Sequence, residues 1–289
     1  MNPSLPLRGR FAPSPTGPLH LGSLVAALAS YLLAKAQHGS WLIRIEDLDP
    51  PREIKGMAEH QIKTLQQFGL VSDEAIVWQS QRSQAYETAL ETLLREEKAF
   101  YCSCSRKQLQ SQNSIHRFCQ NPENQSQSAI RLRMPDETLA FKDAIYGIQK
   151  QNLARDVGDM VLKRADGLYA YQLAVVIDDA AQGINQVVRG ADLLDSTLRQ
   201  IYLQQQLGFA SPNYVHIPLV LNELGQKLSK SLWAKALNEE DQFTAFQTAY
   251  VHLGQNSHVL NRQQNAETRL QVALEHFDAA LISPIKARG

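Results

Sequence analysis

Two segments of the sequence carry side chains suited to binding phosphate groups. The first, residues 15–23, lies between a predicted strand and a predicted helix and contains His20 and Gly22. At such a junction the helix-start amides face the carboxyl ends of the strands, where nucleotides bind. His20 could donate a hydrogen bond to phosphate, and Gly22 would allow a nucleotide to approach the backbone. Taken alone, the pair is also typical of an ordinary turn.

The second segment, Lys-Leu-Ser-Lys-Ser at residues 227–231, follows a predicted strand over residues 217–221. Two lysines and two serines suit a loop that closes over a triphosphate. Attack on the α-phosphate expels pyrophosphate, and lysine ammonium groups neutralise the charge that grows on the leaving oxygens. Taken alone, such a run is more often a solvated loop.

The third chemical signal is a cysteine cluster. All three cysteines fall within eighteen residues, and with one histidine they form the pattern C-x-C-x11-H-x2-C: Cys102, Cys104, His116 and Cys119. Four such ligands suit a closed, tetrahedral, structural zinc site, and the alternative is three free thiols. Because three cysteines cannot form a fully paired disulfide framework, we expect a cytoplasmic protein.

The elements around these signals alternate between strand and helix. Strands are predicted over residues 9–12 and 41–45, with helices over 21–33, 57–68 and 86–94. This rhythm is typical of parallel βαβ units. It breaks over residues 102–150, which we interpret as an insertion, and resumes at 159–163, followed by a helix over 171–179, a strand over 186–189 and a helix over 196–207. Beyond residue 236 the chain is predicted to be helical.

Composition narrows the class of protein. The 289 residues include 29 Lys+Arg and 29 Asp+Glu, and this zero net charge disfavours a general binder of polyanions. Basic residues nevertheless gather over residues 98–133, six against the single acid Glu123. A hydrophobic content of 44% with 20% charged residues is that of a folded globular chain. The longest apolar stretch is interrupted by polar residues, so no membrane helix is expected, and the first residues lack the layout of a signal peptide.

The phosphate-binding segments together resemble the HIGH and KMSKS signatures of class I aminoacyl-tRNA synthetases. Residues 10–17, 44–49 and 188–192 resemble the glutamyl branch of that class. The resemblance implies an α/β fold: a Rossmann-type doubly wound parallel sheet with a small zinc-containing insertion and a helical C-terminal part. The implied divisions are two halves of the catalytic domain at 1–100 and 151–235, the insertion at 101–150 and the helical region at 236–289.

The resemblance also implies roles for individual residues. Glu46 would hold the α-ammonium of glutamate, and Arg10, Tyr171 and Arg189 would bind its carboxylates, with the choice between the two arginines left open. Ser14 completes this glutamate set. The implied ATP-binding residues, which act with Mg²⁺, are His20, Gly22, Ser23, Lys227, Ser229 and Lys230, of which His20, Lys227 and Lys230 are the catalytic ones. The alternative is surface ion pairs for Arg10 and Glu46 and core packing for Tyr171.

Two departures favour one subfamily, the truncated glutamyl-queuosine tRNA(Asp) synthetases. Ser23 replaces the last histidine of HIGH, where it could donate to the nucleotide or cap the helix. Only 58 residues follow Ser231, which we expect to be too few for an anticodon-binding region. That subfamily has zinc ligands of the form C-x-C, tyrosine and cysteine, and His116 stands near the tyrosine position.

The subfamily resemblance implies two reaction steps. Glutamate and ATP would give glutamyl-adenylate without tRNA, and the glutamyl group would then pass to queuosine in the anticodon of tRNA(Asp). One alternative is a minimal glutamyl-tRNA synthetase that charges a tRNA 3′ end. Another is a non-catalytic, zinc-stabilised tRNA-binding paralogue.

Overall fold

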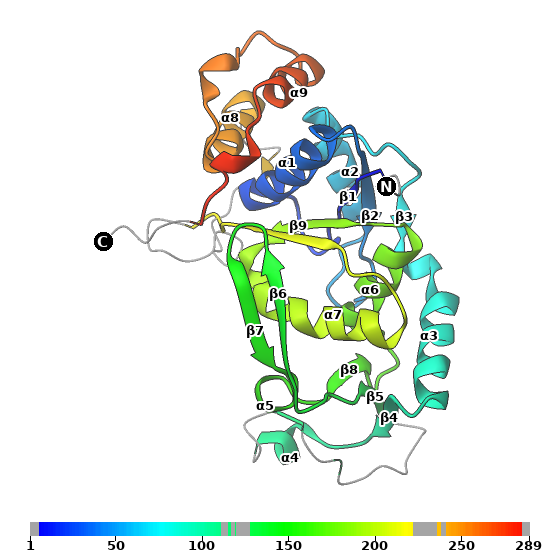
Figure 1. Cartoon of the computed structure of the whole chain (residues 1–289). Helices are drawn as coiled ribbons and strands as arrows, with labels where there is room; N and C mark the ends of the chain where they lie inside the picture. The colour runs from blue at the N-terminus through cyan, green and yellow to red at the C-terminus, as the bar shows by residue number, and fades with distance from the viewer. Residues whose placement is uncertain are drawn as a thin grey trace.

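The computed structural model describes residues 6–110, 115–116, 119, 128–221, 236–237 and 241–284. It begins with two parallel crossovers (Figure 1). β1 (Arg8–Phe11), β2 (Ser40–Ile45) and β3 (Val77–Trp78) pair in that order. The helices between and after them are α1 (Leu21–Lys35), α2 (Met57–Gln67) and α3 (Ser83–Arg95), with the short η1 (Gln79–Gln81) before α3. The predicted strands and helices of this part are confirmed.

A second parallel pair continues the sheet. α6 (Tyr171–Ala181) precedes β9 (Gln186–Gly190), and η3 (Ala191–Ser196) with α7 (Thr197–Gln206) leads to β10 (Asn213–Ile217), which pairs with β9. The amide of Asn185 donates to the Arg8 carbonyl at 3.1 Å, so β9 lies beside β1. The connections from β1 and β9 leave in opposite directions along the sheet, which makes this a switch point where ligands bind.

Both faces of the sheet are covered, which explains the apolar runs in its strands. Along β2, Trp41 and Ile43 are buried among the residues of α1, α2 and the C-terminal helices, whereas Leu42 is buried with those of α3, α6 and α7. Alternate residues of a strand point to opposite faces, so a strand buried on both sides is apolar throughout.

The strand expected at residues 159–163 is present, but the expectation that it resumes the parallel α/β alternation is wrong. β8 (Met160–Lys163) is antiparallel to β5 (Ala129–Leu132), which is antiparallel to β4 (Ala99–Cys102). A hairpin of β6 (Thr138–Asp143) and β7 (Gly147–Asn152) and two short helices, α4 (Arg106–Gln110) and α5 (Leu153–Asp156), complete this part. Strand-forming residue types do not specify a strand's direction, so the sequence pattern could not reveal this sheet.

The strand expected at residues 217–221 lies earlier in the chain. β10 ends at Ile217 because Pro218 has no amide to continue the ladder. The predicted helical C-terminal part is confirmed by α8 (Gln242–His252) and α9 (Ala266–Glu275), with the short η6 (Ser257–Val259) and η7 (Ala279–Leu281). α8 packs on α1 through buried Phe246 and Tyr250.

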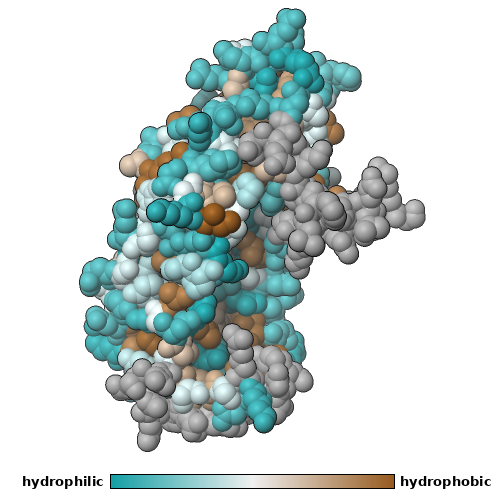
Figure 2. Space-filling view, turned by 180° about the vertical axis from the view of Figure 1, so that it is seen from behind, coloured by the Kyte–Doolittle hydropathy of each residue, from teal (hydrophilic) through white to brown (hydrophobic). Residues whose placement is uncertain are grey.

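The described part of the face seen in Figure 2 is mainly hydrophilic. Seen from behind, hydrophobic side chains occur in small, separate areas along a molecule that is longer than it is wide (Figure 2). In the described ranges, no helix has both the length and the apolar content needed to cross a bilayer.

A buried ionic network ties the two halves of the sheet together. Asp179 of α6 accepts from Arg10 of β1 at 3.0 and 3.2 Å and from Arg44 of β2 at 2.7 Å. Arg44 also donates to Glu46 at 3.3 Å. Burial acts to raise the pKa of Asp179, but the charges of Arg10 and Arg44 outweigh it and hold this pKa below its ordinary value. Asp179 therefore stays ionised in the interior.

Replacing Asp179 with Asn should lower the free energy of unfolding by about 3–5 kcal/mol, because buried Arg10 loses its counter-charge and buried Arg44 keeps only that of Glu46. Urea denaturation measures this change. Glu74→Gln is the matched control, since the Arg8–Glu74 pair is solvent-exposed and its loss should matter far less. Equal effects of the two substitutions would contradict the importance of the buried network.

Candidate active site

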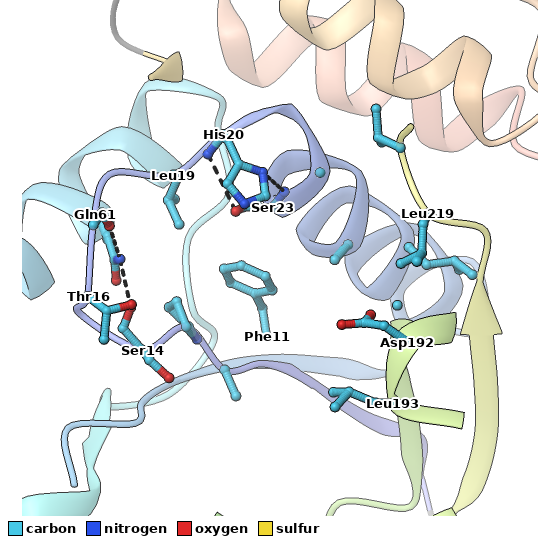
Figure 3. A pocket seen from close by; sticks show the side chains of 18 of the residues that line it. Phe11, Ser14, Thr16, Leu19, His20, Ser23, Gln61, Asp192, Leu193 and Leu219 are labelled. Carbon is cyan, nitrogen blue, oxygen red and sulfur yellow. Dashed lines mark hydrogen bonds between the residues drawn. The ribbon is translucent and has the colours of Figure 1, made fainter. Parts of the chain in front are cut away.

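A cavity of about 490 Å³ opens where the carboxyl ends of β1, β9 and β10 meet α1. Its lining includes Phe11 at the end of β1, Ser14 of the β1–α1 loop, and Asp192 and Leu193 of η3, and Figure 3 shows these side chains around the cavity. Gln61 of α2 is buried and donates to the carbonyls of Ser14 at 3.0 Å and Gly17 at 2.7 Å. The β1–α1 loop, which contains Pro13, Pro15 and Pro18, is thus held in place by α2.

His20 is the N-cap of α1, and it forms a capping box with Ser23. The Ser23 amide donates to His20 Nδ1 at 3.2 Å, and the His20 amide donates to Ser23 Oγ at 3.4 Å (Figure 3). Ser23 is therefore the third residue of the helix. The expectation that Ser23 could be the N-cap is wrong, because His20 is the N-cap. Because Nδ1 accepts a hydrogen bond, the neutral ring carries its proton on Nε2 and can donate from that nitrogen.

Gly22 is needed for this arrangement. A Cβ at position 22 would lie 3.1 Å from Cε1 and 3.2 Å from Nδ1 of His20, whereas a Cβ at Gly17 would meet no atom within 4 Å. The glycine thus admits the imidazole ring against the first turn of the helix. Its predicted role, access of a nucleotide to the backbone, is not tested by this contact.

Three of the residues predicted to bind glutamate line a second cavity, of about 560 Å³. They are Ser14, Glu46 and Tyr171. Ser14 also lines the first cavity, so the two cavities meet at this residue. Tyr171 is not a core residue, since 36% of its surface is accessible.

The two predicted arginines lie deeper and have different partners. Arg10, 4% exposed, is bound to the Asp179 carboxylate. Arg189, 6% exposed, is held by neutral groups, donating to Thr197 Oγ1 at 2.8 Å and to Gln200 Oε1 at 2.7 Å. The ion pair of Arg10 is buried, so the alternative of a surface ion pair for this residue is wrong. The positive charge of Arg10 is thus balanced inside the protein, whereas the named partners of Arg189 carry no charge.

Electrostatic interactions connect these residues. Burial raises the pKa of Glu46 above its ordinary value, although Arg44 and Arg10 oppose the shift. Two effects raise the pKa of Tyr171: the surrounding atoms exclude water, and the Glu46 carboxylate is negatively charged. The charges of Arg189 and Arg10 act in the opposite direction. The four residues predicted from separate segments therefore interact across one site.

Some functional residues were predicted and others were missed. Lys227, Ser229 and Lys230 lie outside the described residues, so their predicted role stays a prediction. Asp192, Gln61 and Asp179 were not predicted as site residues, although Asp192 lies in the segment 188–192 that resembles the glutamyl branch. The sequence signal for Asp179 is its place at the end of an apolar helix, next to another acid.

The predicted metal ligands come together at one end of the molecule. One ligand atom from each of Cys102, Cys104, His116 and Cys119 lies within 4.8 Å of all the others. His116 Nε2 lies 3.2 Å from Cys102 Sγ, and His116 Nδ1 lies 2.8 Å from Asp159 Oδ2. A carboxylate behind a histidine is the usual outer support of a zinc ligand. The donor set and its support therefore fit zinc.

Similarity to known proteins identifies the family. Residues 6–253 match the family described as tRNA synthetases class I (E and Q), catalytic domain. The chain is 52% identical over 281 residues to the Glutamyl-Q tRNA(Asp) synthetase of Xanthomonas axonopodis pv. citri, covering 97% of this chain and 94% of the relative. The chain belongs to the glutamyl-Q tRNA(Asp) synthetase family.

Other relatives agree with this family. The Glutamyl-Q tRNA(Asp) synthetase of Pseudomonas aeruginosa is 48% identical over 276 residues, covering 95% of this chain and 94% of its own length. Among solved structures, the glutamate tRNA ligase of Elizabethkingia meningosepticum in complex with its amino acid has a TM-score of 0.78 at 25% identity. That match covers 98% of this chain and 67% of the ligase, so the family shares the class I catalytic fold.

Replacing Gly22 with Ala should weaken ATP binding by about tenfold, because the added methyl displaces the His20 ring from its hydrogen-bonding position. Calorimetric titration with ATP measures the affinity. Gly17→Ala, in the same loop but with open space around its Cβ, should bind ATP like the wild type. Full ATP affinity in the Gly22 variant would contradict a role of the His20 geometry.

Proposed function

We propose that this chain activates glutamate with ATP, without tRNA, and transfers the glutamyl group to queuosine in the anticodon of tRNA(Asp). The observation that carries this proposal is the identity of about half of all residues, over nearly the whole chain, to proteins named Glutamyl-Q tRNA(Asp) synthetase. The meeting of two cavities at Ser14 supports it, because an adenylate must join a nucleotide site to an amino-acid site.

The first cavity is proposed to bind ATP. His20 would donate from Nε2 to a phosphate oxygen, and Gly22 and Ser23 would lie against the nucleotide at the start of α1. Lys227, Ser229 and Lys230 would close over the phosphates, where Mg²⁺ and the two lysines neutralise charge on the departing pyrophosphate. The glutamate α-carboxylate attacks the α-phosphorus, and the bond from that phosphorus to the β-phosphate oxygen breaks.

The second cavity is proposed to bind glutamate. Glu46 would bind the α-ammonium group, with Ser14 and Tyr171 as hydrogen-bonding groups of the wall. The charges of Arg10 and Arg44 are matched by the carboxylates of Asp179 and Glu46, so Arg10 can add little net attraction for an anion. Arg189 has neutral hydrogen-bonding partners and keeps its charge for the side-chain carboxylate of glutamate. A neutral glutamine amide would gain less from this guanidinium group.

The transfer step needs no covalent enzyme intermediate. A hydroxyl oxygen of the queuosine cyclopentenediol attacks the carbonyl carbon of glutamyl-adenylate, AMP leaves with the electron pair of the broken bond, and the hydroxyl proton is released. Positioning of the two substrates and neutralisation of the phosphate charge supply the catalysis.

We also propose that Cys102, Cys104, His116 and Cys119 bind one structural zinc ion. Zinc would join the end of β4 to residues 116 and 119, far along the chain from that strand. The imidazole of His116 is oriented by Asp159, whose other oxygen accepts from the Met134 amide at 2.9 Å. With four protein ligands the ion would have no open position for a substrate.

The wild-type protein should catalyse glutamate-dependent exchange between ATP and pyrophosphate in the absence of tRNA. It should also label tRNA(Asp) that contains queuosine, and not tRNA that lacks queuosine or whose queuosine has been oxidised by periodate. Glu46→Gln should reduce the exchange by about tenfold or more, since the neutral amide no longer attracts the α-ammonium group of glutamate with a negative charge. Glu74→Gln, at an exposed position, is the matched control.

Each alternative gives a different result in the same assays. Undiminished charging of tRNA without queuosine would identify a minimal glutamyl-tRNA synthetase. Absence of exchange with intact tRNA binding would identify a non-catalytic paralogue.

The purified protein should contain about one zinc ion per chain, measured by elemental mass spectrometry. Cys102→Ser should lose most of this zinc and lower the melting temperature, because the ion stabilises a segment with few apolar anchors. Ser103→Ala, next to it in the chain, should retain both. Wild-type protein that carries no zinc and whose melting temperature is unchanged by a strong chelator would contradict the site.

A further inference from the structure

A buried chain of hydrogen bonds leads from the β6–β7 hairpin to Arg189. The Arg189 Nε–H group donates to His216 Nε2 at 3.0 Å, and His216 Nδ1 lies 2.7 Å from Asp143 Oδ2. Asp143 is 1% exposed and His216 is fully buried. None of these contacts is needed for the sheet itself, in which His216 is simply one residue of β10.

The contacts assign the protonation of His216. Because Arg189 can only donate, His216 Nε2 must accept and carries no proton. The ring proton is therefore on Nδ1, where the Asp143 carboxylate accepts it. Burial lowers the pKa of His216, and the hydrogen bond to Asp143 only partly opposes this, so the ring is neutral at physiological pH.

Asp143 is itself fixed by the hairpin turn. Its Oδ1 accepts from the amides of Ile145 and Tyr146, both at 2.9 Å, and its Oδ2 also accepts from the His216 amide at 3.1 Å. The Ala144 amide donates to the Tyr214 carbonyl at 3.0 Å, which holds the turn against β10. The carboxylate has one available orientation, so it specifies one tautomer of His216.

We propose that His216, oriented by Asp143, is a positioning residue that sets the guanidinium plane of Arg189 for the glutamate carboxylate. The inference rests on the proposed function. A neutral acceptor is suited to this role, because it fixes the direction of Nε–H without cancelling the charge that the substrate requires. An acidic residue at position 216 would neutralise Arg189, as Asp179 does for Arg10. The Tyr214 ring, stacked on His216 and 5.2 Å from the Arg189 guanidinium, holds both groups in register.

Two substitutions at His216 test the role of the acceptor. In His216→Leu no atom of residue 216 can accept from the Arg189 Nε–H group, and the KM for glutamate in the exchange assay should rise by about tenfold or more. In His216→Gln the amide oxygen can accept in place of Nε2, so most of the wild-type KM should be recovered. In both variants the KM for ATP should stay within about threefold of the wild type, since the ATP cavity is not touched.

A third substitution tests the tautomer. In Asp143→Asn the amide oxygen is required by the turn amides, so the amide NH₂ faces His216 Nδ1 and forces the proton to Nε2. Two donors then oppose each other between His216 and Arg189, and the KM for glutamate should again rise by about tenfold. Nitrogen-15 NMR of histidine-labelled protein, assigned with His216→Leu, should show protonated Nδ1 in the wild type and protonated Nε2 in this variant.

Asn213→Ala is the matched control, because Asn213 is the exposed first residue of the same strand. Its KM for glutamate should be unchanged. A wild-type His216 protonated on Nε2, or a KM that rises equally in the Leu and Gln variants of His216 and in the Asn213 variant, would overturn the positioning role. Absence of glutamate-dependent exchange in the wild type would instead refute the proposed function, while the NMR result on the tautomer would stand separately.

Discussion

The carboxylate of Asp179 is the interaction on which the two halves of the sheet depend. It binds guanidinium groups from β1 and β2 while itself belonging to the helix that precedes β9. An unpaired charge in this interior would be very costly, so the three side chains specify one relative position of the strands and helix. The same contact also affects the charge of the site, because it pairs Arg10 with a carboxylate, whereas Arg189 donates to the neutral side chains of Thr197, Gln200 and His216.

The positions of the two cavities follow from that junction. Strands that run parallel present their carboxyl ends at one edge, and the loops after β1, β9 and β10 all line the first cavity. The β1–α1 loop continues into the second cavity at Ser14. One loop, held by Gln61 and closed by the His20–Ser23 capping box, therefore contacts both sites.

Much of the fold was predictable because periodicity reports burial. The leucines of α1 and the apolar runs of β2 and β9 predicted elements that the structure confirms, and the spacing of the cysteines predicted a cluster that the structure brings together. The residue types of a strand do not show whether it pairs parallel or antiparallel, so the pairing of β8 was predicted wrongly. Asp143 and His216 were missed because a polar residue in a strand gives no sign of a partner 73 positions away. A histidine within the apolar run of β10 was the available signal.

The register of β4 and β5 has an evolutionary consequence. Cys102, the last residue of β4, pairs with Ala129, the first residue of β5, so the chain leaves and re-enters the sheet at neighbouring points. The entropy cost of closing a loop grows only slowly with its length. Residues can therefore be gained or lost between these fixed ends without altering the sheet, as long as the cluster is kept. Length variation among relatives should concentrate in this segment, while the β1–α1 loop, bound on both sides, keeps its length.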